Sequence, residues 1–283
     1  MFGKSRQVYY RSKNSKWQRA AKAEKVITMV NEIRAKMPRV GTRKLYHILQ
    51  EPLKELNVGR DRLFAILRAN QMTITPKRTY RVTTNTHHRF RKHKDLICDM
   101  QITHPEQVWV ADITYLGQRN NCLYLCFVTD AYSKKIMGYD IADSLDTSGV
   151  KRALTMACNN RSYPQQKLIH HSDKGLQYCA NDYQLLLNNN KIMCSMTQQY
   201  DPYSNAVAER INGIIKNEFN LEDYQLDKKL MKVLIEEVVN IYNQQRPHFS
   251  CSMLTPNQMH KQNEIKIKTY KSKNRSQIYS ASV

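Results

Sequence analysis

The 283-residue chain is long enough for one sizeable domain with smaller ones beside it, and 41% hydrophobic with 24% charged residues is an ordinary globular balance. Its longest apolar run, 123–128, is far shorter than the roughly 20 residues that span a bilayer, and no signal-peptide pattern follows the basic start. Seven cysteines without a CxxC pair favour reduced thiols and argue against a zinc ribbon. We therefore expect a cytoplasmic protein with no membrane partner.

The formal net charge of +21 is unevenly distributed. Residues 1–94 hold 24 Lys and Arg against 5 Asp and Glu, residues 95–260 hold 15 against 18, and residues 261–283 hold 6 against 1. Basic ends around a nearly neutral centre are typical of a protein that binds phosphates with its ends and performs chemistry at its centre. The charge alone fits an architectural nucleic-acid binder equally well.

The first part of the chain predicts three helices. Apolar residues recur at three- and four-residue spacings over 17–37, where Pro38 ends the first helix; Thr42 can cap a second, which ends near Pro52, and a third follows Gly59. Residues 1–74 therefore predict a small basic helix-turn-helix-like domain, with a solvated helical bundle as the alternative. The side chains expected to meet a DNA backbone are Arg39, Arg43, Lys44, Arg60, Arg62 and Arg68.

A change of pattern marks the next part of the chain. Residues 75–104 lack periodicity and predict a basic linker. Strand-like runs over 108–115, 122–129 and 135–141 predict an antiparallel meander, followed by helices near 147–160 and 181–190, short strands at 167–170 and 192–195, and longer helices at 204–219 and 226–244. This order indicates an α/β domain over 105–262, with a mixed sheet covered by helices, before a basic tail at 263–283.

Three acids stand where an acid is locally unexpected. Asp112 interrupts an apolar strand, Asp173 directly follows another, and Glu209 lies on a helix beside an apolar stripe. A polar strip on that helix repeats at helical spacing and comprises Asn205, Glu209, Asn212 and Lys216. Each acid taken singly could also be a helix cap or a surface charge.

Converging carboxylates suit hard divalent cations. Three acids together with a substrate phosphate can hold two Mg²⁺ (or Mn²⁺) ions within about 4 Å of each other. Such ions activate a water or a 3′-hydroxyl on one side and stabilise the leaving oxygen on the other, so the acids predict metal-dependent phosphodiester cleavage or strand transfer.

These motifs resemble the bacterial insertion-sequence transposases whose second reading frame encodes the catalytic protein, relatives of retroviral integrase. The matching segments are WVADITY (109–115), HSDKGLQY (171–178), YSNAVAER (203–210), YNQQRPH (242–248) and LTP (254–256). The 35 residues between Asp173 and Glu209 match the D,D-35-E spacing of that family. Residues 41–45 (GTRKL) and 59–64 (GRDRLF) resemble the small helical domain before its catalytic core.

The resemblance implies a ribonuclease-H-like fold with Asp112, Asp173 and Glu209 as the catalytic, metal-binding triad. It implies recognition of terminal inverted repeats, strand cleavage, and 3′-hydroxyl attack on a target DNA, with Lys216 contacting DNA. It further implies a homo-oligomer on DNA, a nucleoid-associated location in a bacterial cell, and a first-frame helix-turn-helix and leucine-zipper partner or fusion, because this chain has no heptad zipper of its own.

Some functional interpretations stay open at the level of sequence. Arg246 and His248 could reach DNA phosphates or cap the carbonyls of the helix that Pro247 ends. His170 and His171 adjoin the second acid, and we expect them to orient it rather than to bind metal. A nuclease that cuts without joining, or a transposon-derived DNA-binding regulator, would share much of this sequence pattern; the three acids favour an enzyme over a regulator.

Overall fold

The computed structural model describes residues 6–75, 93–98, 100–117, 122–197 and 206–267. Its N-terminal part contains four helices: α1 (Arg6–Lys36), α2 (Thr42–Ile48), α3 (Gln50–Glu55) and α4 (Arg60–Ala69). The expectation of one helix ending near Pro52 was wrong, because a new helix begins at Gln50. Proline is tolerated there, since the first turn of a helix leaves its backbone N–H groups without intrahelical partners.

A five-stranded sheet forms the centre of the rest of the chain, in the order β3-β2-β1-β4-β5. Strands β1 (Val108–Leu116), β2 (Leu123–Asp130) and β3 (Ile136–Ala142) form the predicted antiparallel meander. Strand β4 (Leu168–Ser172) pairs with β1 in parallel, and β5 (Ile192–Met196) pairs with β4 in parallel. The mixed α/β sheet expected from the sequence is therefore confirmed.

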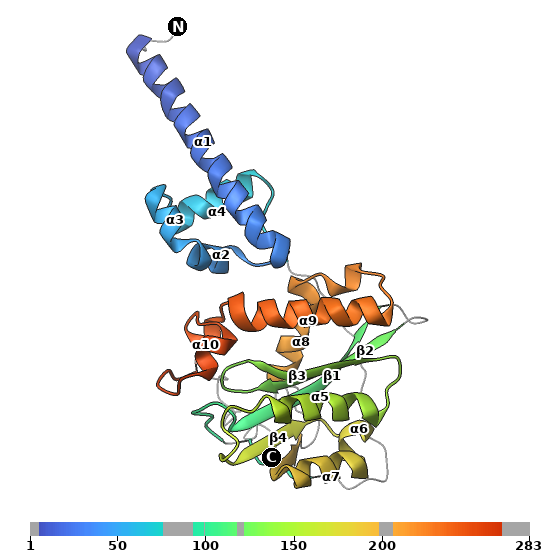
Figure 1. Ribbon diagram of the computed structural model, residues 1–283. Helices are drawn as coiled ribbons and strands as arrows, with labels where there is room; N and C mark the ends of the chain where they lie inside the picture. The colour runs from blue at the N-terminus through green and yellow to red at the C-terminus, as the bar shows by residue number, and fades with distance from the viewer. Residues whose placement is uncertain (1–5, 76–92, 99, 118–121, 198–205, 268–283) are drawn as a thin grey trace, which may run out of the picture.

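Helices cover both faces of this sheet (Figure 1). On one face lie α5 (Thr147–Asn159), α6 (Leu176–Cys179) and α7 (Asn181–Asn189). On the other lie α8 (Ala206–Glu218) and α9 (Lys228–Gln245). At Gly138 on β3 a side chain would collide with the backbone of Ala153 in α5, so the close approach of helix and sheet requires glycine there.

Short elements complete the described fold: η1 (Leu221–Asp223), η2 (Phe249–Cys251) and α10 (Pro256–His260). Thr255 caps α10 in a capping box with Gln258. A buried ionic cluster ties α10 to the start of β1, because Glu106 accepts hydrogen bonds from Arg161 (3.1 Å) and lies 3.3 Å from His260. These contacts fasten α10 to the start of the central strand.

The N-terminal helices share a hydrophobic core with α8 and α9. Val30 of α1 and Leu45 of α2 belong to the same buried cluster as Ile215 of α8 and Ile235 of α9. In Figure 1 the first half of α1 projects away from the rest of the protein. The boundaries proposed at residues 74, 104 and 262 remain predictions, and most of the expected linker and tail lies outside the described residues.

Among the described helices, none combines the length and the apolar character that crossing a membrane would take. The described cysteines are all free thiols.

Candidate active site

Asp112 occupies the central strand, on the face that α8 covers. Val108 and Val110 pack with Ala208 of α8, whereas Trp109 packs with the helices of the opposite face. Because successive side chains of a strand point to opposite faces, Asp112 shares the face of the two valines. This shared face, and the burial of Trp109 on the opposite face, agree with the strand pattern of the sequence. A carboxylate in this apolar row requires a compensating partner.

The pairing of β1 with β4 brings Asp173 to the same end of the sheet as Asp112. The parallel register of β1 and β4 matches Val110 with His171; two residues further along the chain stand Asp112, still within β1, and Asp173, just past the end of β4. Asp173 directly follows the last residue of β4, where the chain leaves the sheet, and its Oδ1 accepts the Gly175 N–H at 3.0 Å. A Cβ on Gly175 would come within 2.9 Å of the same oxygen, so this turn requires glycine.

Glu209 comes from the first turn of α8, which crosses the face of the sheet carrying Asp112. One turn later on the same helix, Asn212 donates a hydrogen bond from its Nδ2 to Oδ2 of Asp112 at 2.8 Å. Asn212 is only 5% exposed. We had expected Asn212 to contact DNA, and that prediction was wrong, because its amide is buried against the first acid and orients it.

The three carboxylates perturb one another electrostatically. Burial, and next the charge of Asp173, raise the pKa of Asp112 to about 8. Burial and then Asp173 also raise the pKa of Glu209. Asp112 retains some exposed surface, but the surrounding protein removes most of the water that would stabilise its charge. Groups of like charge in such a setting favour protonation or a bound cation, and the shifts couple Asp112 to both other acids and Glu209 to Asp173.

The residue chemistry fits a hard divalent cation. The three acids offer only oxygen donors, which Mg²⁺ prefers. Beside them, Oδ1 of the buried Asn212 has no hydrogen-bond partner among the described residues, so one further oxygen acceptor is left unused next to Asp112. Within the described ranges no three His, Cys, Asp or Glu side chains are gathered closely enough to enclose an ion.

The two histidines beside the second acid have structural partners. His170 is fully buried, its Nε2 lies 2.8 Å from the Tyr183 hydroxyl, and burial and then His171 lower its pKa to about 3. Nδ1 of His171 lies 2.9 Å from the Ser195 hydroxyl on β5. His170 therefore stays neutral within the helix layer of the opposite face, and His171 joins β4 to β5.

Lys44, which we expected to reach DNA, and Arg246 and His248, for which DNA contact was one of two interpretations, are buried. Lys44 is 7% exposed, Arg246 is 2% exposed and His248 is 6% exposed. Lys44 and Arg246 both bind the carboxylate of Glu218, and the ring of His248 packs edge-on against Tyr242. The expected DNA contact of Lys44 and the phosphate interpretation of Arg246 and His248 were wrong, because tertiary packing turns these side chains inward.

The other expected DNA contacts have varied environments. Arg43, Arg60 and Arg62 are exposed on the N-terminal helices, as expected, and Arg60 lies beside Asp61. Lys216 forms an ion pair with Glu222 at 2.8 Å. Asn205 lies outside the described residues. A DNA role for the exposed arginines and for Lys216 stays a prediction.

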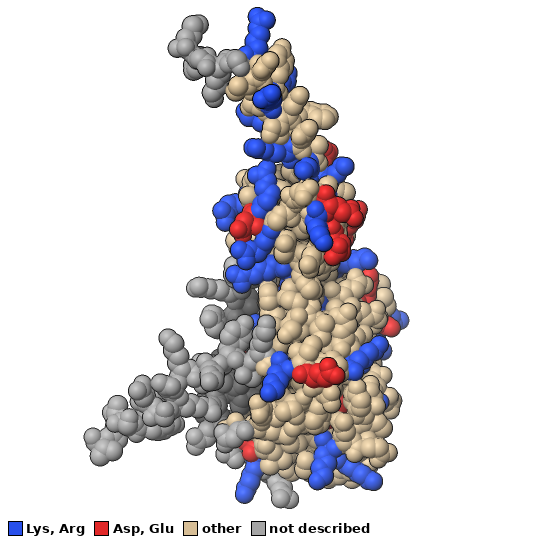
Figure 2. All heavy atoms as spheres, turned by 90° about the vertical axis from the view of Figure 1, so that its left-hand side faces the viewer, with Lys and Arg blue, Asp and Glu red and all other residues tan. Residues whose placement is uncertain are grey.

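A basic surface on α1 was not assigned residue by residue from the sequence. Over residues 6–22 every side chain is exposed or half-exposed, six of them are Lys or Arg, and none is acidic. Figure 2 shows these cations along the projecting part of the helix. Trp17 is 77% exposed and stands nine residues from the buried Val26, which is two and a half turns and therefore the opposite face. The sequence did contain a sign of this basic surface, because no acidic residue precedes Glu24.

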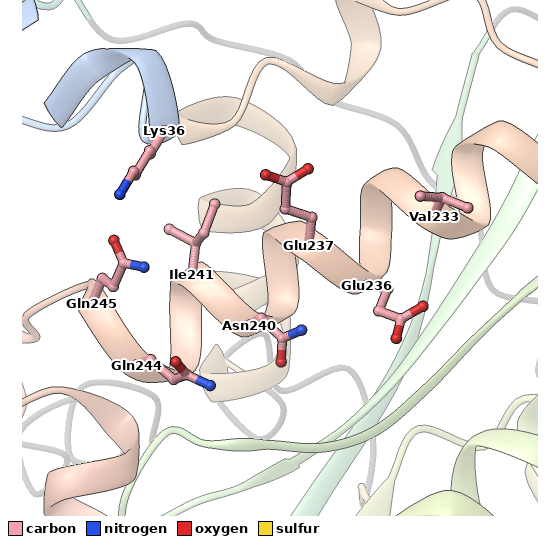
Figure 3. Close-up of a pocket in the computed structure, with 8 residues that line it drawn as sticks. All are labelled: Lys36, Val233, Glu236, Glu237, Asn240, Ile241, Gln244 and Gln245. Carbon is pink, nitrogen blue, oxygen red and sulfur yellow. The ribbon is translucent and has the colours of Figure 1, made fainter. Parts of the chain in front are cut away.

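A surface pocket lies away from the acids. It has a volume of about 460 Å³ and is bordered by Lys36 at the end of α1 and by the outer face of α9. Figure 3 shows Glu236, Glu237 and Asn240 along this side of α9. None of the three acids of the candidate active site lines it, so the pocket is separate from that site.

Two family models match the chain, both described as integrase core domains, over residues 102–202 and 190–256. A 31 kDa protein of insertion element IS600 from Shigella sonnei is 33% identical over 262 residues, covering 90% of this chain and 94% of that protein. The IS904 transposase of Lactococcus lactis is 29% identical over 57% of this chain and 64% of its own length. The InsF transposase of IS3fB from Escherichia coli is 31% identical over 58% of this chain and 57% of its own length.

Solved structures with a similar arrangement come from retroviral integrases. A simian T-cell lymphotropic virus intasome in complex with a PP2A regulatory subunit matches with a TM-score of 0.48 and 18% identity, over 82% of this chain and 78% of that one. The HTLV-2 integrase catalytic core in complex with magnesium matches with a TM-score of 0.43 and 19% identity, over 56% of this chain and 97% of that one.

The matched models and the mixed sheet place residues 102–256 in the class of integrase core domains. The chain belongs to the IS3-type insertion-sequence transposases, as the sequence motifs indicated.

Proposed function

We propose that this chain is a catalytic transposase that cleaves DNA strands and joins the freed ends to target DNA in a metal-dependent reaction. Asp112, Asp173 and Glu209 are the residues that hold the metal, two Mg²⁺ or Mn²⁺ ions. The observation that supports the proposal is the electrostatic coupling of carboxylates carried by β1, the end of β4 and α8: burial and then Asp173 raise the pKa values of both Asp112 and Glu209.

The chain's own groups support this chemistry by orienting two of the acids and by releasing a proton when metal binds. The Asn212 amide holds Oδ2 of Asp112, and the Gly175 N–H holds Oδ1 of Asp173, so two of the acids are oriented by neighbours. Because a metal binds the ionised carboxylates, its binding releases the proton that Asp112 holds below about pH 8. When bound, the ions supply activation of the attacking hydroxyl and stabilisation of the leaving oxygen.

The substrate under this proposal is DNA, as terminal inverted repeats and a target duplex. The exposed cations of α1 lie along its projecting part, and Arg43, Arg60 and Arg62 are exposed as well, so all of these side chains are available to phosphates. Lys216, on the same helix as Glu209, would contact DNA after leaving Glu222. A homo-oligomer on DNA, joined by a first-frame protein or fusion and located at the bacterial nucleoid, completes the proposal.

The test is a cleavage and joining assay with labelled duplexes that end in the element's own inverted repeats, in Mg²⁺. The wild-type chain, with and without the fused first-frame domain, is compared with Glu209→Gln. Glu237→Gln serves as the control, because it removes an equal charge from the exposed outer face of α9. We expect metal-dependent nicked and joined products from the wild type and the control only.

Other outcomes separate the alternatives. Nicked products without joined ones would identify a nuclease. Sequence-specific binding with no metal-dependent product, even after fusion to the first-frame domain, would identify a DNA-binding regulator. Equal activity of Glu209→Gln and the wild type would remove Glu209 from the catalytic set.

A further inference from the structure

Glu218, the last residue of α8, is the meeting point of three parts of the chain. Its carboxylate accepts hydrogen bonds from Lys44 Nζ of α2 at 2.6 Å and from Arg246 Nε and Nη2, at the end of α9, at 2.7 and 2.8 Å. Its backbone carbonyl accepts the Arg39 N–H at 2.9 Å. The Lys44 and Arg246 side chains are 8% and 3% exposed, so both ion pairs are shielded from water and salt.

The positive charges of Lys44 and Arg246 are balanced by the Glu218 carboxylate and by the C-terminal end of α8. Two cations face one carboxylate, and the carbonyls at the C-terminus of α8 carry additional partial negative charge. Arg246 binds both carboxylate oxygens, which fixes the direction of the side chain as well as its position. The junction therefore restrains both the rotation of α8 about its axis and its displacement along it.

The same helix carries the third acid. Glu209 and Glu218 are nine residues apart, which in an α-helix is two and a half turns and about 13 Å. Glu218 thus faces the N-terminal helices from the side of α8 opposite to Glu209, and Asn212 between them holds Asp112. A helix of this length moves as a rigid rod, so a rotation allowed at Glu218 also displaces the Glu209 carboxylate.

We propose that Glu218 is a positioning residue: with Lys44 and Arg246 it holds α8 in the rotation that directs Glu209 towards Asp112 and Asp173. Through Lys44, the position of Glu209 depends on the docking of the N-terminal helical region. This inference rests on the proposed function. It assigns to Lys44 and Arg246 an internal role in place of the DNA contacts expected from the sequence.

The test compares Mg²⁺ with Mn²⁺ in the joining reaction of Lys44→Met and Glu218→Gln. Mg²⁺ demands a nearly ideal octahedron of ligands, so a displaced carboxylate should slow the Mg²⁺ reaction about 10- to 100-fold and the Mn²⁺ reaction much less. Glu218→Gln could unfold the protein, because it weakens both ion pairs of the junction. Lys44→Met keeps the Arg246–Glu218 pair, so it tests the same role in a protein that remains folded. Lys44→Arg retains the cation and should keep near-normal rates in both metals.

A second readout does not depend on activity. In metal-free protein, hydrogen exchange over residues 206–218 should accelerate in Lys44→Met. The matched control is Arg161→Met, which breaks another buried ion pair, with Glu106, away from α8. We expect the control to lower the melting temperature while leaving both the Mg²⁺/Mn²⁺ rate ratio and the exchange of α8 unchanged.

The outcomes distinguish this inference from the proposed function. If Glu209→Gln is inactive but Lys44→Met shows the control's rate ratio and exchange, the junction is purely structural and the inference fails alone. If Glu209→Gln joins DNA as well as the wild type does, the proposed function fails, and the positioning role fails with it. A changed ratio in both junction variants together with faster exchange in Lys44→Met supports the inference.

Discussion

Replacing Asp112 by Asn should make the metal-free protein more stable while abolishing its activity. The folded structure raises the pKa of Asp112 from 3.8 to about 8, with burial as the first cause and Asp173 as the second. At about 1.4 kcal/mol per pKa unit, ionising this carboxyl in the folded state costs on the order of 5 kcal/mol as an upper limit. Structural relaxation and water penetration reduce the cost, and we expect about 2–3 kcal/mol.

The pH dependence follows from the direction of the shift. A carboxyl with a raised folded pKa contributes stability that is fully present below its unfolded pKa, near 4, and that is lost as the pH rises to the folded pKa, near 8. Asn carries no charge and has an oxygen that can still accept the Asn212 hydrogen bond. The stability difference between Asp112→Asn and the wild type should therefore grow from pH 5 to pH 8 and then level off.

The assay is thermal or urea unfolding in EDTA across that pH range, repeated in Mg²⁺. The expected gain at pH 8 corresponds to a rise in melting temperature of roughly 5–10 °C. Mg²⁺ should narrow the gap by stabilising only the wild type, since ligands that bind the folded state raise its stability. A variant no more stable than the wild type at pH 8, or a gap that does not change with pH, would refute the electrostatic account of this site.

Three further predictions concern DNA contacts and the core. Lys13→Ala on the projecting part of α1 should lower the salt dependence of DNA binding by about one phosphate contact, whereas Lys232→Ala on α9 should leave the slope unchanged; equal slopes for both would contradict a role for α1. Lys216→Ala should also reduce the slope by about one, measured on transposon-end duplexes, and an unchanged slope would leave Lys216 as a partner of Glu222 only. Tyr183→Phe removes the hydroxyl that contacts the buried His170 and should lower unfolding stability by about 1–3 kcal/mol in urea titrations; no loss would show that this contact contributes little.

The junction at Glu218 shows how one helix can serve two parts of a protein. Its first turn carries a candidate metal ligand, and its last residue is held by the N-terminal helices and the end of α9. In the buried cluster of α1, α2, α8 and α9, apolar contacts hold the same elements together. The ion pairs at Glu218 add a directional restraint, because hydrogen bonds to charged groups depend on geometry in a way that apolar burial does not.

The sequence by itself determined the strands and most helices, and it marked the three acids as the candidate catalytic residues. Alternating apolar residues around Asp112 predicted its strand and its face, and the apolar run before Asp173 predicted the second strand, because local periodicity reflects which side of an element is buried. The polar strip around Glu209 is also a local pattern, so it was readable without a structure. The integrase-core assignment followed from these motifs together with their spacing.

Only the tertiary structure decided which polar side chains face solvent and which face the interior. Lys44, Arg246 and Asn212 each stand at positions where periodicity allows exposure, yet each is buried against an acid distant in sequence. Pairing between residues 28 to 174 positions apart leaves no local pattern, since it depends on how helices pack across the sheet. The sequence determined where the acids lie along the chain, and packing alone determined which partners hold them.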